Sequence, residues 1–98
     1  MIEIRKTEEF ERWLRALRDR TARTKVLVRI DRLALGNPGD VRPVGGGISE
    51  MRIDHGPGYR AYFTQRSAVL IILLCGGDKG TQERDIRRAK DIVEGLED

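Results

Sequence analysis

The chain has 98 residues, of which 39% are hydrophobic and 36% are charged, and its net charge is +3. This length suits one domain with one modest core, and the apolar share excludes an intrinsically disordered chain. Residues 1–47 carry eleven Lys and Arg against seven Asp and Glu, or +4, which suits either a nucleic acid or an acidic protein partner. Arginine outnumbers lysine by fifteen to four, a bias that fits phosphate binding or a GC-rich genome equally well.

The N-terminal segment predicts a strand followed by a helix. Residues 2–5 alternate apolar and polar side chains, as a short strand does. Thr7 is the expected N-cap of a helix over 8–18. Its apolar side chains recur at helical spacing and are interpreted as core residues rather than as a platform for stacking bases: Phe10, Trp13, Leu14 and Leu17.

A second helix is predicted over 22–35, because Gly36 can end it and Pro38 prevents its continuation. Its expected apolar stripe is Leu27, Ile30, Leu33 and Ala34. The short connection makes the two helices an antiparallel hairpin. The outer faces are basic and suit either solvent or a partner such as ribosomal RNA: Arg12, Arg15, Arg18, Arg23, Lys25, Arg29 and Arg32.

Residues 36–47 form a predicted loop that contains a short strand at 40–44. Pro43 would confine that strand to a sheet edge, because proline has no N–H to donate. The three glycines at 45–47 predict a turn and not a phosphate-binding loop. Neither Lys-Ser nor Lys-Thr follows them, and no helix begins there.

The second half of the chain predicts three antiparallel strands, at 48–53, 59–65 and 68–75, separated by short turns. The third is apolar at every position, so we expect it inside the sheet with both faces covered. Thr81 is the expected cap of a final helix that runs to about Glu94. Its apolar stripe is Ile86, Ala89, Val93 and Leu96.

These elements predict an α+β fold in which residues 1–98 form a single domain. An N-terminal strand and a helical hairpin pack on an antiparallel sheet, and a helix ends the chain. The lone Cys75 excludes a disulfide framework, and with one histidine it does not make a metal site. The N-terminus has no apolar signal region, and the longest apolar run, 68–75, is too short to span a bilayer. We therefore expect a cytoplasmic protein that has no membrane association, metal or cofactor.

The turn at 54–58, DHGPG, fixes which side chains of its two strands lie opposite one another. If it joins antiparallel strands, Arg52 lies opposite Arg60 and Glu50 lies opposite Tyr62, all on one face of the sheet. The other face would pack under the helices: Met51, Ile53, Tyr59, Ala61 and Phe63.

Two opposed arginines repel each other unless an anion lies between them. Glu50 could supply that charge, which would leave an ion-pair cluster on a solvated or cleft-lining face. Alternatively, Arg52 and Arg60 form a site for a phosphate. Lys79 favours the phosphate site because it follows the apolar strand, in a glycine-flanked loop before a helix. Backbone N–H groups there would add donors: Gly80, Thr81 and Gln82.

The stretches SEMRIDHGPGYRAYF (49–63) and LIILLCGGDKGTQERDIRRA (70–89) resemble the RelE/ParE superfamily of toxins from type II toxin–antitoxin systems. The closest resemblance is to the phage-derived addiction module killer protein branch, which is similar to HigB toxins, and it covers nearly the whole chain. It implies a RelE-like microbial RNase fold and a ribosome-dependent mRNA endoribonuclease, or mRNA interferase, that inhibits translation. The implied cleavage needs no metal, because the ribose 2′-hydroxyl attacks the adjacent phosphate.

The resemblance also implies partners and site residues. A cognate antitoxin with a helix-turn-helix domain would neutralise the toxin, and operator DNA would be bound only through that antitoxin. By position, Arg60 matches the arginine that contacts the scissile phosphate, and Lys79 matches a basic residue that supports the leaving group. Arg52 matches one basic residue of the preceding strand. Glu50 replaces another, and would act as a carboxylate base or as an ion-pair partner.

One departure from the family pattern concerns the final helix, which has no aromatic residue where RelE and HigB toxins use a tyrosine. Tyr62 and His55 are the substitutes, His55 because histidine is a residue type suited to proton transfer, and Gln82 is a further candidate for substrate binding. The departure keeps two alternatives open. One is a ParE-like, non-enzymatic inhibitor of DNA gyrase, and the other is an inactive remnant that only binds its antitoxin.

Overall fold

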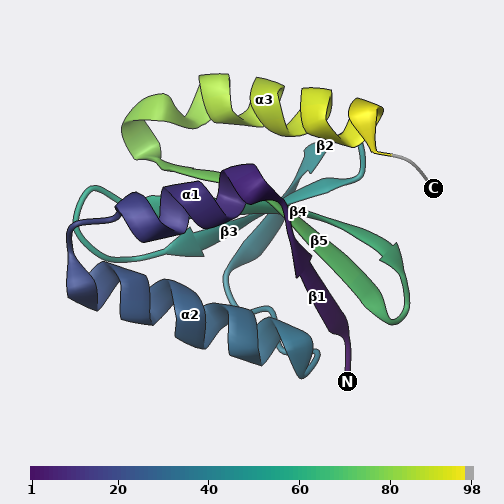
Figure 1. Cartoon of the computed structure of the whole chain (residues 1–98), viewed down its shortest axis with the longest axis horizontal. Helices are drawn as coiled ribbons and strands as arrows, with labels where there is room; N and C mark the ends of the chain where they lie inside the picture. The colour runs from purple at the N-terminus through teal and green to yellow at the C-terminus, as the bar shows by residue number, and fades with distance from the viewer. Residues whose placement is uncertain (97–98) are drawn as a thin grey trace.

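The computed structural model describes residues 1–96 and confirms the α+β class (Figure 1). In chain order its elements are β1 (Glu3–Lys6), α1 (Glu8–Ala16), α2 (Arg20–Ala34), β2 (Val41–Gly45), β3 (Ile48–Ile53), β4 (Tyr59–Ser67), β5 (Leu70–Asp78), the 3₁₀ turn η1 (Lys79–Thr81) and α3 (Gln82–Gly95). Thr7 caps α1 as predicted, and its hydroxyl accepts a hydrogen bond from the Phe10 N–H at 3.0 Å.

The five strands form one sheet in the order β1-β5-β4-β3-β2. The four strands from β2 to β5 are antiparallel neighbours, as expected for a meander. The sequence predicted β1 but not its partner in the sheet; β1 pairs parallel to β5 at one edge, so the sheet as a whole is mixed. No tight turn joins these two strands, so the chain can return to β5 in the parallel direction. β5 is an inner strand, which accounts for its apolar run.

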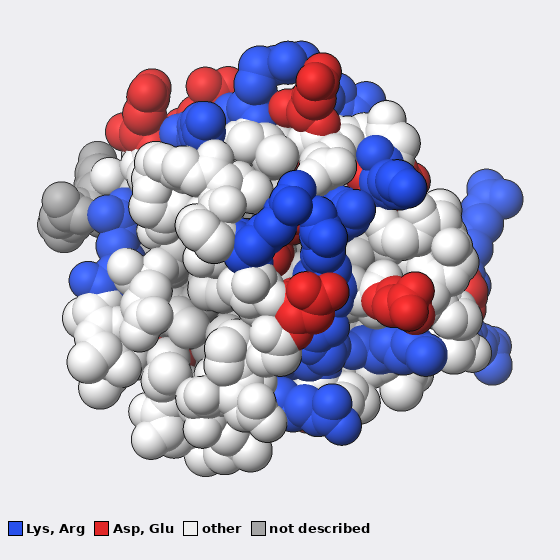
Figure 2. Space-filling model, turned by 180° about the vertical axis from the view of Figure 1, so that it is seen from behind, with Lys and Arg blue, Asp and Glu red and all other residues white. Residues whose placement is uncertain are grey.

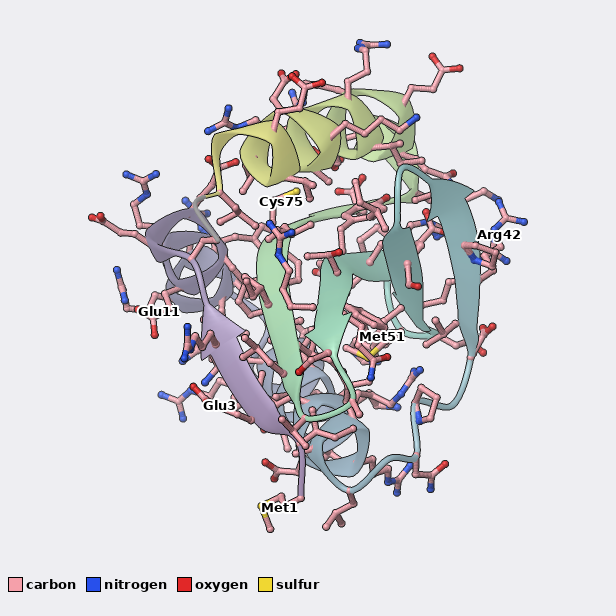
Figure 3. All side chains as sticks on the ribbon, turned by 90° about the vertical axis from the view of Figure 1, so that its right-hand side faces the viewer. Met1, Glu3, Glu11, Arg42, Met51 and Cys75 are labelled. Atoms are coloured by element: carbon pink, nitrogen blue, oxygen red, sulfur yellow. The ribbon has the colours of Figure 1, made fainter. Side chains whose placement is uncertain are left out.

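Helices cover both faces of the sheet (Figure 1). α1 and α2 bury one face in a cluster that includes Phe10, Ile30 and Met51. α3 covers part of the other face, where Ala89 packs with Tyr62 in a second cluster. Figure 3 shows the helices on either side of the sheet, with Cys75 directly beneath α3. The face of the sheet that carries Glu50 and Tyr62 was expected to face solvent or a cleft, but α3 partly covers it.

The apolar stripe of α2 differs by one position from the prediction. Leu27, expected in the core, is 42% exposed, whereas Val26 is completely buried. The buried side chains recur every four residues and then after three, starting in the first turn: Ala22, Val26, Ile30 and Leu33. The helix also begins earlier than expected, because Asp19 caps it through bonds from two backbone N–H groups.

The edge strand and its glycine turn agree with the prediction. β2 is the outermost strand, and Pro43 lies opposite Ser49 of β3 without a strand on its other side. All three glycines at 45–47 have positive φ angles, of 93°, 64° and 75°, which favour residues without a Cβ.

Two glycines at the end of β5 permit close packing of other elements. A Cβ on Gly76 would overlap the indole of Trp13, and a Cβ on Gly77 would overlap the carboxylate of Asp85. The side chain of Asp78 then accepts the Gly80 N–H at 2.8 Å, which shapes η1. These three residues set where the chain, and with it Lys79, leaves the sheet.

Within residues 1–96, no helix is long and apolar enough to cross a membrane. The same range holds no group of three or more His, Cys, Asp or Glu side chains arranged to bind a metal ion.

Candidate functional site

Glu50 is the centre of the candidate site. It lies in the middle of β3, opposite Tyr62 of β4, and none of its surface is exposed. Its Oε2 accepts hydrogen bonds from the Tyr62 hydroxyl at 3.0 Å and from the Gln82 amide at 2.9 Å. Its Oε1 accepts one from Arg52 Nε at 3.1 Å. Both carboxylate oxygens are thus already bonded by the protein itself.

Three arginines surround this carboxylate. Arg52 is hydrogen-bonded to it, Arg60 Nε lies 3.7 Å from Oε2, and Arg42 Nε lies 3.5 Å from Oε1. The register confirms that Arg52 faces Arg60, and also places Arg42 of β2 opposite Glu50. We call Glu50, its three arginines, Tyr62 and Gln82 the Glu50 cluster. One negative charge offsets the mutual repulsion of three positive ones.

The pKa of Glu50 reflects two opposing effects. Burial alone would raise it, because a charged carboxylate loses its hydration. The hydrogen bonds from Arg52, Tyr62 and Gln82, together with the charge of Arg60, outweigh burial and hold the pKa below its usual value of 4.5. Glu50 is therefore an ionised anchor for the arginines at neutral pH. Of the two predicted roles, this geometry favours the ion pair over the proton-accepting base.

Tyr62 cannot contact a substrate, contrary to the prediction. Its side chain is completely buried under α3, and its hydroxyl donates to Glu50. Burial, followed by the adjacent negative charge of Glu50, raises the pKa of Tyr62 well above its ordinary value. The residue therefore supports the cluster from within the core. The reason that the prediction failed is that the sequence does not show where α3 lies.

Arg60 differs from the other cluster arginines in how it is held. It is 8% exposed, and among residues 1–96 its buried Nε has no hydrogen-bond partner, because the distance to Glu50 is too long for one. Arg60 also lines a pocket of about 290 Å³ together with Arg52 and Lys79. We call this the arginine pocket. A largely buried arginine with an unused N–H donor, beside a pocket, is suited to binding an anion.

The arginine pocket brings together the three residues predicted to be catalytic: Arg52, Arg60 and Lys79. Lys79 is exposed and reaches the pocket from η1, next to Gly58 of the β3–β4 turn. The expected backbone donors are not all free, since the Gly80 N–H is bonded to Asp78. The cationic side chains of Arg52, Arg60 and Lys79 are therefore the groups that define this site.

His55 and Gln82 are placed differently from the prediction. His55 does not line the arginine pocket; its Nε2 lies 2.8 Å from Oδ2 of Asp19, the cap of α2. This contact joins the β3–β4 turn to the helical hairpin. His55 therefore helps to hold the turn whose residues Asp54 and Gly58 line the arginine pocket. Gln82 uses its amide to bond Glu50 and lines a neighbouring pocket.

Sequence reasoning missed three charged residues at the site. Arg42 was left out because the strand around it was not paired with 48–53, although the glycine turn at 45–47 would have placed it opposite Glu50. Asp40 and Asp54 line the arginine pocket and give it two carboxylates. No motif singles these two out, since each is one acidic residue in a polar loop.

Charge is distributed unevenly over the molecular surface. Figure 2 shows one face on which lysine and arginine side chains form a band with a few acidic side chains among them, next to a broad area with few charges. Arg42 lies at the outer edge of the sheet, on β2 (Figure 3). Basic bands of this kind favour binding of a polyanion.

Similar proteins agree with the resemblance found in the sequence. Residues 12–94 match the family described as phage-derived protein Gp49-like (DUF891). A protein of Haemophilus influenzae, named only as an uncharacterized protein, is 48% identical over 95 residues, which cover 97% of this chain and 96% of that protein. No solved structure matches the chain.

Proposed function

The chain belongs to the phage-derived Gp49-like family, a RelE/Gp49 toxin-type family, and from that premise we propose that it is an mRNA-cleaving toxin. A toxin-type family implies an antitoxin as partner. The finer proposal is a HigB-like endoribonuclease that acts on ribosome-bound mRNA. In this proposal the antitoxin carries a helix-turn-helix domain, and operator DNA is reached only through it.

The observation that carries the proposal is the state of Arg60. Arg60 is nine-tenths buried, its Nε makes no hydrogen bond within residues 1–96, and the residue lines a pocket that it shares with two other cations. Burying a cation in this way costs free energy unless an anion compensates for it. The carboxylate of Glu50, 3.7 Å from Arg60 Nε, offsets part of the positive charge. A phosphate bound in the arginine pocket would offset the rest.

The proposed reaction is transfer of a phosphoryl group within the RNA. The ribose 2′-oxygen attacks the adjacent phosphorus, the bond to the 5′-oxygen breaks, and the products are a 2′,3′-cyclic phosphate and a 5′-hydroxyl end. Arg60 and Arg52 would bind the non-bridging oxygens, whose negative charge increases in the transition state. Lys79 would donate to the departing 5′-oxygen.

The proton of the 2′-hydroxyl needs an acceptor in this reaction. Glu50 is unsuited because both of its oxygens are bonded and its pKa is lowered by those bonds. We assign the role to one of the two carboxylates that line the arginine pocket, Asp40 or Asp54.

A second candidate function is inhibition of a protein target, as in ParE-like inhibitors of DNA gyrase. The observation that favours it is the placement of Tyr62 and His55, because neither of these acid–base candidates lines the arginine pocket. In that case the basic band would bind a protein surface, and mRNA would remain uncut in growth-arrested cells.

The test is expression of the gene alone, followed by primer extension on a translated reporter mRNA. We expect growth arrest and in-frame cuts with the wild-type protein, and neither with Arg60→Ala. Lys79→Ala is the second variant, because Lys79 is exposed and its loss leaves the core intact. Arg20→Ala is the control, since Arg20 is exposed at the start of α2 and lines no part of the arginine pocket. Arrest with uncut mRNA would support the gyrase candidate, and full toxicity of Arg60→Ala and Lys79→Ala would place the site elsewhere.

A further inference from the structure

A second cationic pocket lies directly beside the arginine pocket. It has a volume of about 400 Å³ and is lined by the first turns of α3, including Arg84 and Arg87, and by Lys79. Lys79 lines both pockets, so the two adjoin at this residue. We call the second one the α3 pocket.

The α3 pocket has a net positive charge that comes from side chains. Three cations line it against one carboxylate, Glu83. Arg84 and Arg87 are three residues apart on α3, a spacing that puts both on the same side of the helix. The Gly80 N–H adds no free donor here, because it is already bonded to Asp78.

The two arginines of the α3 pocket, Arg84 and Arg87, contribute little to holding the fold together. The side chain of Arg84 is 73% exposed and its ion pair with Asp85 spans 3.7 Å. Arg87 is also exposed. Their neighbour Arg88, by contrast, donates three hydrogen bonds to Glu9 and so joins α3 to α1. Arg88 therefore has a structural role, whereas Arg84 and Arg87 line the α3 pocket with exposed side chains.

Hydrogen bonds hold Thr81 and Gln82, two residues that line the α3 pocket, in place. Gln82 lines the α3 pocket and donates its amide to Glu50, which also holds Arg52 of the arginine pocket. Thr81 donates its hydroxyl to the carboxylate of Asp85. Two adjoining cationic pockets held by one network suit a ligand that carries two phosphates in succession.

We infer that the α3 pocket binds the phosphate next to the scissile one along a single-stranded RNA, with Arg84 and Arg87 as its ligands and Lys79 between the two sites. This inference rests on the proposed function, because it takes the arginine pocket to hold the scissile phosphate. It adds a footprint of at least two phosphates, recognised by charge and without regard to base identity.

The test measures binding of a single-stranded RNA oligonucleotide in which every 2′-hydroxyl is methylated, so that it cannot be cleaved by 2′-oxygen attack. Kd is measured as a function of salt for the wild-type protein and for Arg84→Gln/Arg87→Gln. We expect the double variant to bind roughly tenfold more weakly, the loss of one charge-assisted phosphate contact. The slope of log K against log salt should become shallower by about 0.7, the value for one phosphate of a single strand.

The matched control is Arg5→Gln/Arg20→Gln, which removes the same charge from exposed positions that line neither pocket. Equal losses in both double variants would overturn the inference, as would failure of the wild-type protein to bind the oligonucleotide. Unchanged affinity in Arg84→Gln/Arg87→Gln, in a protein whose Arg60→Ala variant no longer cuts mRNA, would reject the second phosphate site alone. Reduced affinity in a protein that cuts no mRNA would reject the nuclease proposal and keep the site. Thermal unfolding of each variant checks that the fold is intact.

Discussion

At the scale of single residues, Glu50 determines how the arginines of the site are held. Its carboxylate is completely buried and lies within 3.7 Å of three guanidinium groups. The sequence predicted that Glu50 shares a face with Arg52, Arg60 and Tyr62, because strand alternation and a short turn are local properties. It did not predict that this face is buried, because burial depends on where α3 packs, many residues further along the chain.

Removing the carboxylate of Glu50 should destabilise the fold strongly. Glu50→Gln is expected to lower the free energy of unfolding at neutral pH by about 3 kcal/mol, since it leaves buried cations without their counter-ion. The pKa of Glu50 is lowered in the folded protein, so its stabilising effect is present above pH 4.5 and is lost as the pH falls further. The difference between wild type and variant should therefore shrink below that pH. Denaturant unfolding across this pH range measures it.

Glu94→Gln is the control for this experiment, because it removes the same charge from an exposed position on α3. It should leave the free energy of unfolding nearly unchanged. If Glu50→Gln behaves like Glu94→Gln, then Glu50 does not anchor the arginines.

At the scale of elements, the junction of β5, η1 and α3 positions the site. Gly76 admits the Trp13 indole and Gly77 admits the Asp85 carboxylate, which brings α1 and α3 close to the end of β5. The helices, strands and antiparallel register were predictable because they follow from periodicity and turns. The parallel pairing of β1 with β5 was not, since nothing local dictates the direction in which distant strands pair.

Replacing Gly77 by alanine adds one methyl group and tests whether Asp85 packs directly against this position. Gly77→Ala should lower the free energy of unfolding by about 1–3 kcal/mol, because the new Cβ overlaps Asp85 and the core cannot absorb it without strain. Gly95→Ala is the matched control, since Gly95 lies in α3 with no atom near its would-be Cβ. Because Gly95 is the last residue of α3, Gly95→Ala should change the free energy of unfolding by less than about 1 kcal/mol. Thermal unfolding distinguishes the two, and a neutral Gly77→Ala would contradict the packing described.

At the scale of the whole molecule, the sheet is enclosed between α1 and α2 on one face and α3 on the other. The sequence predicted the hairpin as a cover for one face but gave no position for α3. Because α3 packs there, the ion pairs that were expected on a solvated or cleft-lining face form the partly covered Glu50 cluster. The first turns of α3 also line the α3 pocket. It also removes Tyr62 from the candidates that can touch a substrate.

The reactivity of Cys75 measures how well α3 covers the sheet, because Cys75 lies on β5 and packs against α3. Burial, and then the nearby Asp85 charge, raise the pKa of Cys75 to about 12, and its thiol donates to the Asp85 carbonyl. We expect iodoacetamide to modify it slowly in the native protein at neutral pH and rapidly in denaturant, since only the thiolate reacts. Val69→Cys in a Cys75→Ala background is the exposed control, because Val69 is 62% exposed. Equal native rates at the two positions would mean that α3 does not cover the sheet.

The most direct test of the central claim uses purified protein and ribosomes programmed with a defined mRNA. The claim is that Arg60, with Arg52 and Lys79, holds the scissile phosphate in the arginine pocket. The wild-type protein should produce RNA ends with a 2′,3′-cyclic phosphate. Arg60→Lys, which keeps the charge near Glu50 but loses the planar fork, should cut far more slowly, and Arg60→Ala should not cut at all. Cleavage by a folded Arg60→Ala variant at the wild-type rate would contradict the claim.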